Sequence, residues 1–181
     1  MEPIHTIGVF LRPLTHSLKQ YFFEFQDLAT SLGFEVVLES ISAKMIGIEG
    51  LDFESVCHKS DALLSIGGDG TLISVARRSF IHQKPILGIN MGNLGFLTDL
   101  QKEEVETFFP LLKSGNYNIA NHMMLEGSIN GDCFFALNDI ILRHINNGSM
   151  IHLKASIDGE YFNSYYGDGL IIATPTGATA Y

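Results

Sequence analysis

The chain has 181 residues, 46% of them hydrophobic, which suffices for one large domain or two small ones with a packed core. Its formal net charge of −9 argues against broad binding to nucleic acid or to an anionic membrane, since such surfaces need clustered lysine and arginine. No apolar run reaches the roughly 20 residues of a membrane-spanning helix, and the start of the chain lacks the cationic segment of a signal peptide. We therefore expect a cytoplasmic protein.

Cysteine and histidine are sparse and scattered. Cys57 and Cys133 are far apart in the sequence and outside any Cys-x-x-Cys spacing, so we expect buried thiols and no disulfide framework. The seven histidines show no zinc-binding spacing, so we expect no zinc site and assign no metal ligands.

The first part of the chain alternates between strand and helix patterns. This order favours a Rossmann-like parallel sheet covered on both faces, with ligands at the carboxyl ends of its strands. By apolar periodicity the predicted strands are residues 4–11, 34–38, 61–66 and 85–89, and the predicted helices are 15–32, 52–60, 72–80 and 101–113.

The pattern then changes to strands alone. Their turns are the favoured hairpin pairs Asn130-Gly131, Asn147-Gly148 and Asp158-Gly159, which indicate antiparallel structure. We predict an α/β domain over residues 1–116 and a partial antiparallel β domain over residues 117–181. The predicted strand segments of the second domain lie near 119–130, 133–144, 150–158 and 161–173.

The first motif with chemical meaning is Gly67-Gly68-Asp69-Gly70-Thr71, between a predicted strand and a predicted helix. Glycines allow a positive φ and a close approach to a ligand, and the helix N-terminus offers N–H groups to phosphate oxygens. We therefore predict a phosphate-binding turn. Asp69 would bind a metal or take a proton from an attacking hydroxyl, both roles in phosphoryl transfer, and a helix N-cap is the alternative.

Three further segments carry glycines or polar groups at strand ends. The segment 90–98 follows a predicted strand, so it would lie at the same sheet edge as the first turn, or be shaped by packing alone. Asn138 and Asp139 interrupt an apolar strand, where one of them would serve a ligand or bond to a neighbouring loop. The segment 167–181 runs from a strand into a turn of proline, glycine and threonine, a second polar cradle.

The sequences GGDGT at 67–71, NMGNLGFLT at 90–98, ND at 138–139 and GDGLIIATPTGATAY at 167–181 together resemble the NAD kinase family, within the superfamily of diacylglycerol kinase and phosphofructokinase. The resemblance implies an enzyme that phosphorylates the adenosine ribose 2′-hydroxyl of NAD with ATP to give NADP, using a divalent cation such as Mg²⁺. It implies Asp69 as catalytic carboxylate and a homodimer or homotetramer. The nucleotide-binding residues that it implies are Gly68, Gly70, Thr71, Phe96, Asn138, Asp139, Asp168, Thr176, Thr179, Ala180 and Tyr181.

Some positions depart from the family pattern. Ala178 stands where a hydroxyl residue is common, Asp139 where Glu is frequent, and Tyr166 where a basic residue is often found. Family members continue beyond the last motif, which implies truncation and an incomplete β domain. The alternatives are a related kinase for a lipid or sugar phosphate, or a noncatalytic NAD-binding fragment if the native chain ends at residue 181.

Overall fold

The computed structural model describes residues 1–92, 95–146 and 149–179. The chain forms two compact units, Met1–Asn121 and His122–Tyr181. The boundary expected after residue 116 lies a few residues earlier, just beyond the glycine that ends the last helix of the first unit. In the described part of the chain, no helix is both long enough and apolar enough to cross a membrane.

The first unit is a five-stranded parallel sheet with the strand order β2-β1-β3-β4-β5. The predicted alternation of strands and helices is confirmed, and with it the α/β class of this unit. Its elements are β1 (Thr6–Leu11), α1 (Leu18–Ser31), β2 (Glu35–Leu38), α2 (Ser40–Ile46), α3 (Phe53–Lys59), β3 (Ala62–Gly67), α4 (Asp69–Ser79), the 3-10 turn η1 (Phe80–His82), β4 (Ile86–Asn90), β5 (Leu100–Gln101), the 3-10 turn η2 (Lys102–Glu104) and α5 (Val105–Ser114).

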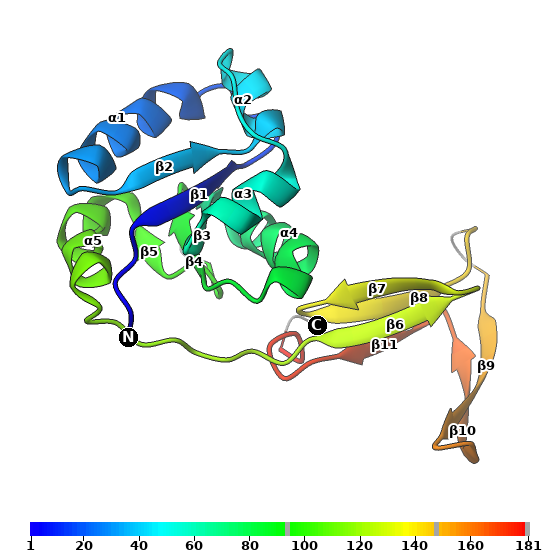
Figure 1. Cartoon of the computed structure of the whole chain (residues 1–181). Coiled ribbons are helices and arrows are strands. Elements are labelled where there is room, and N and C mark those ends of the chain that lie inside the picture. The colour runs from blue at the N-terminus through cyan, green and yellow to red at the C-terminus, as the bar shows by residue number, and fades with distance from the viewer. Residues whose placement is uncertain (93–94, 147–148, 180–181) are drawn as a thin grey trace. The chain divides into compact units, whose positions relative to one another are not determined.

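Helices cover both faces of this sheet, α1 and α5 on one and α3 and α4 on the other (Figure 1). Side chains alternate between the faces along each strand. Val9 of β1 therefore joins the core that includes α1 and α5, and its neighbour Phe10 joins the core that includes α3 and α4. Phe109 of α5 is fully buried and packs edge-on against Phe25 of α1, with ring centroids 5.4 Å apart. Burial of each such side chain contributes about 1.5–3 kcal/mol.

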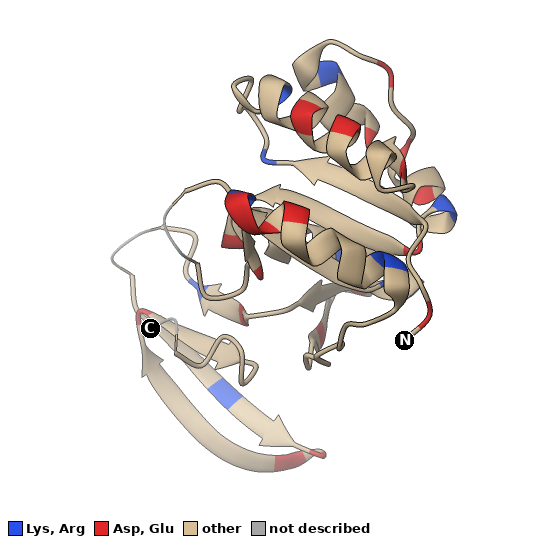
Figure 2. Cartoon of the chain, turned by 90° about the vertical axis from the view of Figure 1, so that its left-hand side faces the viewer, with Lys and Arg blue, Asp and Glu red and all other residues tan. Residues whose placement is uncertain are grey.

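Helix α5 carries its charges in the order that the helix dipole favours. Glu106 lies in its first turn and Lys113 in its last, and Figure 2 shows red at the start of this helix and blue at its end. The Lys113 ammonium also donates to the Gly33 carbonyl at 2.6 Å and lies 5.0 Å from the centroid of the Phe34 ring. One side chain thus joins the end of α5 to the turn that precedes β2.

The second unit consists of three antiparallel strand pairs, β6 with β7, β8 with β11 and β9 with β10. Two predicted hairpin turns are confirmed, because Asn130-Gly131 and Asp158-Gly159 have positive φ at both positions. The predicted turn at Asn147-Gly148 lies outside the described residues. The strands are β6 (Leu125–Ile129), β7 (Asp132–Ala136), β8 (Asp139–Arg143), β9 (Ile151–Ile157), β10 (Glu160–Gly167) and β11 (Gly169–Ala173).

Several predictions about local structure are wrong. The segments 133–144 and 161–173 are not continuous strands, since strand structure is interrupted at Asn138 and at Asp168. Residues 119–124 precede β6 and pair with no strand of the described chain. Asn138 thus lies between two strands, not within one. Cys57 is buried as expected, and burial raises the pKa of its thiol to about 11, whereas Cys133 is exposed.

Candidate active site at the carboxyl edge of the sheet

Asp69 is the first residue of α4, directly after Gly68, and its carboxylate binds the segment that follows β4. Oδ2 accepts a hydrogen bond from the Phe96 N–H at 2.7 Å. Oδ1 accepts from the N–H groups of Leu97 and Thr98, each at 3.1 Å, and from the Thr98 hydroxyl at 3.3 Å. The alternative role of helix N-cap is therefore wrong: this carboxylate holds the two glycine segments together.

The bonding of Asp69 leaves one oxygen with spare capacity. A carboxylate offers about four lone-pair sites. Oδ1 is filled by three donors, whereas Oδ2 has one donor among the described residues and keeps a site for a further hydroxyl or N–H group. Burial opposes ionisation, but the N–H groups of Phe96, Leu97 and Thr98 outweigh it and hold the pKa of Asp69 below its ordinary 3.8. The group is thus an anionic acceptor and a weak base at neutral pH.

The lowered pKa of Asp69 predicts how its contribution to stability varies with pH. A carboxyl whose pKa is lower in the folded state stabilises the fold above its unfolded pKa, near 3.8, and that stabilisation is lost as the pH falls through the folded pKa. We expect the difference in unfolding free energy between wild type and Asp69→Asn to be constant near neutral pH and to shrink only below about pH 4. Urea denaturation between pH 7 and pH 3 measures it. A difference that already falls between pH 6 and pH 5 would mean that the pKa is raised.

The second glycine segment is closed by the side chain of Asn90, at the end of β4. Its Oδ1 accepts from the Gly92 N–H at 2.8 Å, and its Nδ2 donates to the Thr98 hydroxyl at 3.0 Å. Asn90 is only 3% exposed, so these bonds replace the water that its amide would otherwise bind. Within this segment Phe96 is 92% exposed, which leaves an aromatic ring beside the Asp69 carboxylate free to contact a ligand. Residues 93 and 94 lie outside the described part.

Gly95 is the position at which the two segments come closest. A Cβ atom there would lie against Oδ1 of Asp69 and 2.8 Å from its Cγ. We expect Gly95→Ala to push the carboxylate out of its ring of N–H donors and to lower kcat/KM by roughly 10- to 100-fold, as displacements of about 1 Å do. Steady-state kinetics measures the change. Gly92→Ala is the control, because a Cβ atom there would be 3.9 Å from its nearest neighbour among the described residues, Oδ1 of Asn90; an equal loss in both variants would refute the steric argument.

The glycines of the first turn serve a purpose other than the expected positive φ. Gly68 is extended, with φ −160°, and none of the three has a positive φ. At Gly67 a Cβ atom would collide with Thr71, whereas at Gly68 and Gly70 no described heavy atom lies within 4 Å of such a position. The turn therefore packs tightly on the sheet side and is open on the other, where the N–H groups at the start of α4 can approach an anion.

A cavity of about 800 Å³ lies beside this turn, at the carboxyl ends of β1, β2 and β3. Its walls come from the loop after β1, from α2 and from the glycine turn, including Gly68, Gly70 and Thr71. The cationic side chains in its lining are those of Arg12, Lys44 and Arg78. This cavity, which periodicity could not predict, combines open backbone N–H groups with cations in a protein of net negative charge.

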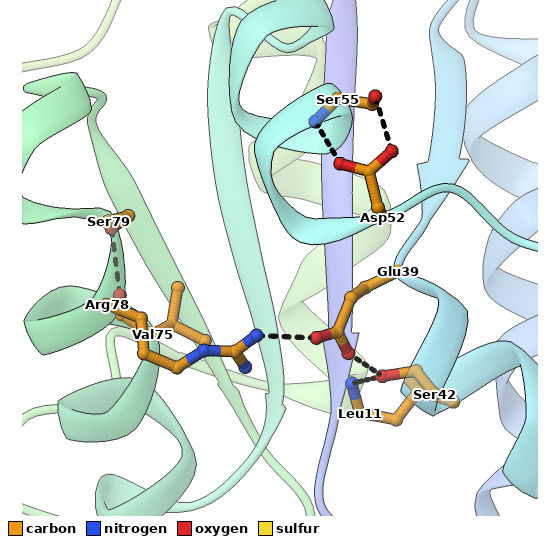
Figure 3. Close-up of polar contacts among 8 residues, drawn as sticks. All are labelled: Leu11, Glu39, Ser42, Asp52, Ser55, Val75, Arg78 and Ser79. Carbon is orange, nitrogen blue, oxygen red and sulfur yellow. Dashed lines mark hydrogen bonds and ion pairs between the residues drawn. The ribbon is translucent and has the colours of Figure 1, made fainter.

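Arg78 is held at the cavity wall by a buried carboxylate, that of Glu39 (Figure 3). Its Nη2 donates to Oε1 of Glu39 at 2.8 Å, and Oε2 accepts from the Ser42 hydroxyl at 3.2 Å. Ser42 in turn accepts from the N–H of Leu11 at 3.0 Å, at the end of β1. This chain connects α4, α2 and β1 around the cavity. The guanidinium also lies 4.1 Å from the centroid of the Phe53 ring.

In the second unit, Asn138 and the turn after β11 form a compact polar cluster. The fully buried Thr174 hydroxyl donates to the Leu137 carbonyl at 2.6 Å and accepts from the Gly177 N–H at 3.1 Å. The Thr174 N–H donates to the Asn138 carbonyl at 2.8 Å. Oδ1 of Asn138 is buried, with no hydrogen-bond partner among the described residues. Such an acceptor is costly unless a ligand or water supplies a donor.

The other site residues predicted in this unit are only partly gathered at that cluster. Thr176 is half-buried, and its hydroxyl lies 3.1 Å from Nδ1 of His122. Asp139 begins β8 opposite Ala173, but exposed Asp168 precedes the other end of β11, roughly 16 Å away by strand length. Thr179 is exposed in the turn, and the predicted residues Ala180 and Tyr181 lie outside the described part.

The fold and this site define a class: a parallel α/β domain with a glycine turn at the carboxyl edge, where open α/β sheets bind their ligands. Residues 7–117 match the model of the ATP-NAD kinase N-terminal domain, and residues 137–181 match that of the ATP-NAD kinase C-terminal domain. The chain belongs to the ATP-NAD kinase family.

The curated relatives agree with this assignment, and two solved structures share the fold. The chain is 54% identical to the NAD kinase of Wolinella succinogenes over 188 residues, covering 100% of this chain and 65% of that protein. It is 41% identical to the NAD kinase of Sulfurimonas denitrificans, covering 98% and 64%. Yeast NADH kinase complexed with NADH shares the fold, with a TM-score of 0.85 at 24% identity over 99% of this chain and 60% of the other. An NAD kinase from Archaeoglobus fulgidus in complex with ATP has a TM-score of 0.72 at 22% identity, covering 97% of this chain and 63% of the other.

Proposed function

We propose that the protein is an NAD kinase, which transfers the γ-phosphoryl group of ATP to the 2′-hydroxyl of the adenosine ribose of NAD. The observation that carries the proposal is the Asp69 carboxylate, anchored by the second glycine segment at the N-terminus of α4 with an acceptor site left on Oδ2. The names of the relatives, at 54% and 41% identity, support it. The chain spans 65% of the length of the first, so activity is proposed for the full-length gene product.

The cavity beside the glycine turn is the proposed site of the donor phosphates. The open space at Gly68 and Gly70 and the positive end of the α4 dipole favour an anion, and Arg12 adds a positive charge, whereas the charge of Arg78 is balanced by Glu39. Such preorganised donors stabilise the charge that spreads over the transferring phosphoryl group. The volume of about 800 Å³ is in the range of sites for small-molecule ligands.

Asp69 is the proposed partner of the attacking hydroxyl. A hydroxyl that donates to Oδ2 would be held with its oxygen lone pairs free for in-line attack. Because the pKa of Asp69 is lowered, the carboxylate is a poor base, and we assign it orientation and late acceptance of the proton. A loose phosphoryl-transfer transition state places little demand on early proton removal.

A divalent cation would neutralise the phosphate charge. The protein groups at the turn can supply few of the ligands of this cation, since the Asp69 carboxylate already accepts four hydrogen bonds. The group of three His, Cys, Asp or Glu side chains that the described residues bring together lies elsewhere, at Glu54, His58 and His82. Phosphates and water are therefore the proposed main ligands, an arrangement typical of Mg²⁺.

In the first unit Phe96 is a proposed NAD contact, and in the second unit, taken by itself, the cluster around Asn138 is proposed to recognise the same class of ligand. The unpartnered Oδ1 of Asn138 is suited to an exocyclic amino group such as that of adenine, and the Thr176 hydroxyl and the Asp139 carboxylate to ribose hydroxyls. The exposed apolar side chains of Ile141 and Ile171, which are paired across β8 and β11, support the proposal of a homodimer or homotetramer, since exposed apolar patches mark interaction surfaces.

A substrate competition tests the proposal. The full-length gene product is given labelled ATP with NAD, a diacylglycerol and a sugar phosphate, and the labelled products are separated. We expect label in NADP alone; label in the lipid or sugar product without NADP would overturn the choice of substrate. Calorimetry with NAD on residues 1–181 and on the full-length product then shows whether this length suffices for binding. If the full-length product binds NAD but does not phosphorylate it, the protein is a noncatalytic NAD-binding module.

A further inference from the structure

A three-residue cluster on the outer face of α3 is distinct from the glycine turn. Glu54 and His58 are four residues apart on α3, so they project from the same side of the helix, and His82 approaches them from η1. One ligand atom from each lies within 4.8 Å of those of the other two. Oε2 of Glu54 is 3.0 Å from Nε2 of His82, and the rings of His58 and His82 meet edge to face at 5.2 Å.

The central atom of this cluster is Nε2 of His82. It is buried and makes no well-aligned hydrogen bond within the described part of the chain, although the Glu54 oxygen is 3.0 Å away. The His82 side chain is 8% exposed. An imidazole lone pair and a carboxylate oxygen repel each other at this distance unless a proton or a metal cation lies between them. With Nε2 unprotonated, the geometry therefore directs the electron pairs of both groups toward one point.

The surroundings hold these groups in place. Asp52 caps α3 by accepting from the Ser55 N–H at 2.9 Å and from its hydroxyl at 2.7 Å (Figure 3). Phe53 contacts the His82 ring, with centroids 6.3 Å apart, and also Phe10 of the core. These contacts fix the start of α3 and the His82 ring, as a preorganised metal site requires, whereas the exposed Glu54 and His58 side chains can still rotate. Cys57 is excluded from the cluster, since its thiol is buried in the core.

We propose that Glu54, His58 and His82 form a site for a transition-metal cation, with Zn²⁺ as the ion that it fits best. Two imidazoles and one carboxylate suit Zn²⁺ and its neighbours in the series, whereas Mg²⁺ prefers oxygen ligands alone. Ligands bound tetrahedrally at 2.0–2.1 Å lie about 3.3 Å apart. Small rotations of Glu54 and His58, which are both exposed, bring the observed 3.0–4.8 Å separations to that value. A fourth position stays open to water.

This site is remote from the glycine turn. Helix α4 has 11 residues, so η1 begins roughly 16 Å from Asp69 at its other end. The metal would join α3 to the end of α4 across the face that these helices cover. Its expected effect is a more stable first unit, since a ligand that binds only the folded state shifts the unfolding equilibrium.

Metal titration of the full-length protein, stripped with EDTA and desalted, tests the site. We expect Zn²⁺ to bind at one site per chain with a Kd on the order of 1 µM, and Co²⁺ to give the visible spectrum of tetrahedral coordination. A 100-fold excess of Zn²⁺ over the Kd should raise Tm by roughly 5 °C. No calorimetric binding at micromolar Zn²⁺ would overturn the proposal.

Matched variants locate the ion. His58→Gln and Glu54→Gln change exposed side chains and should fold, and each should weaken Zn²⁺ binding by roughly 100-fold and abolish the Tm increase. His152→Gln, an exposed histidine of the second unit, should bind like wild type. Cys133→Ser should also be unchanged; if binding instead disappears with this exposed thiol and survives in His58→Gln, the cluster is not the site.

Discussion

Replacing Asp69 with asparagine should lower kcat for NAD phosphorylation by roughly 10²- to 10⁴-fold, the usual cost of losing an acid or base group, with little change in the Kd for NAD. The amide oxygen must take the place of Oδ1, where three donors converge. The NH₂ group then occupies the position of Oδ2, so a donor replaces the one acceptor site that remains for a hydroxyl. Steady-state kinetics and calorimetry on the full-length product measure the two quantities.

Asp61→Asn is the matched control for this variant. Oδ2 of Asp61 also accepts two backbone N–H groups, from His5 at 2.8 Å and Thr6 at 2.9 Å, and its pKa is also lowered. It lies where β1 and β3 begin, at the opposite edge of the sheet. We expect its kcat to be normal. Near-normal turnover in Asp69→Asn would refute the catalytic assignment, and an equal loss in both variants would reduce Asp69 to a structural anchor.

The parallel sheet could be predicted from the sequence because its strands are apolar runs between amphipathic helices. What was missed is local or irregular. Helix α2 (Ser40–Ile46) is short and contains serine and isoleucine, so its periodicity is weak, and β5 has only two residues. The start of α4 was placed too late because glycines are poor helix formers, yet the N-terminal turn accepts them. Asn138 was assigned to a strand because apolar neighbours flank it on both sides.

The candidate site was predictable only as far as its motifs reach. The glycine segments identified Asp69, but the N–H groups that bind it come from residues 27 to 29 positions later. The buried Glu39 was missed, since its partner Arg78 is 39 residues away. In the proposed metal site, Glu54 and His58 lie four residues apart on a predicted helix, but His82 joins them only in the folded chain. Contacts between distant segments depend on packing, which periodicity does not report.

Replacing Arg78 with methionine should lower the free energy of unfolding by about 2–4 kcal/mol, because it leaves the buried Glu39 carboxylate with the Ser42 hydroxyl alone. The figure lies below that for a fully buried pair, since 35% of the Arg78 side chain is exposed to solvent. Urea denaturation measures it. Arg77→Met, on the exposed side of the same helix, is the control and should change stability by less than about 0.5 kcal/mol.

The same ion pair predicts an asymmetry between its two partners. The Glu39 side chain is 4% exposed and that of Arg78 is 35% exposed. Glu39→Gln leaves a cation that can turn toward water and the cavity, whereas Arg78→Met leaves an anion that cannot. Arg78→Met should therefore be the more destabilising, and the double variant should be more stable than Arg78→Met alone, because it removes the unpaired charge. If both single variants lose the same unfolding free energy and the losses add in the double variant, water reaches Glu39. The pair then does not stabilise the cavity wall.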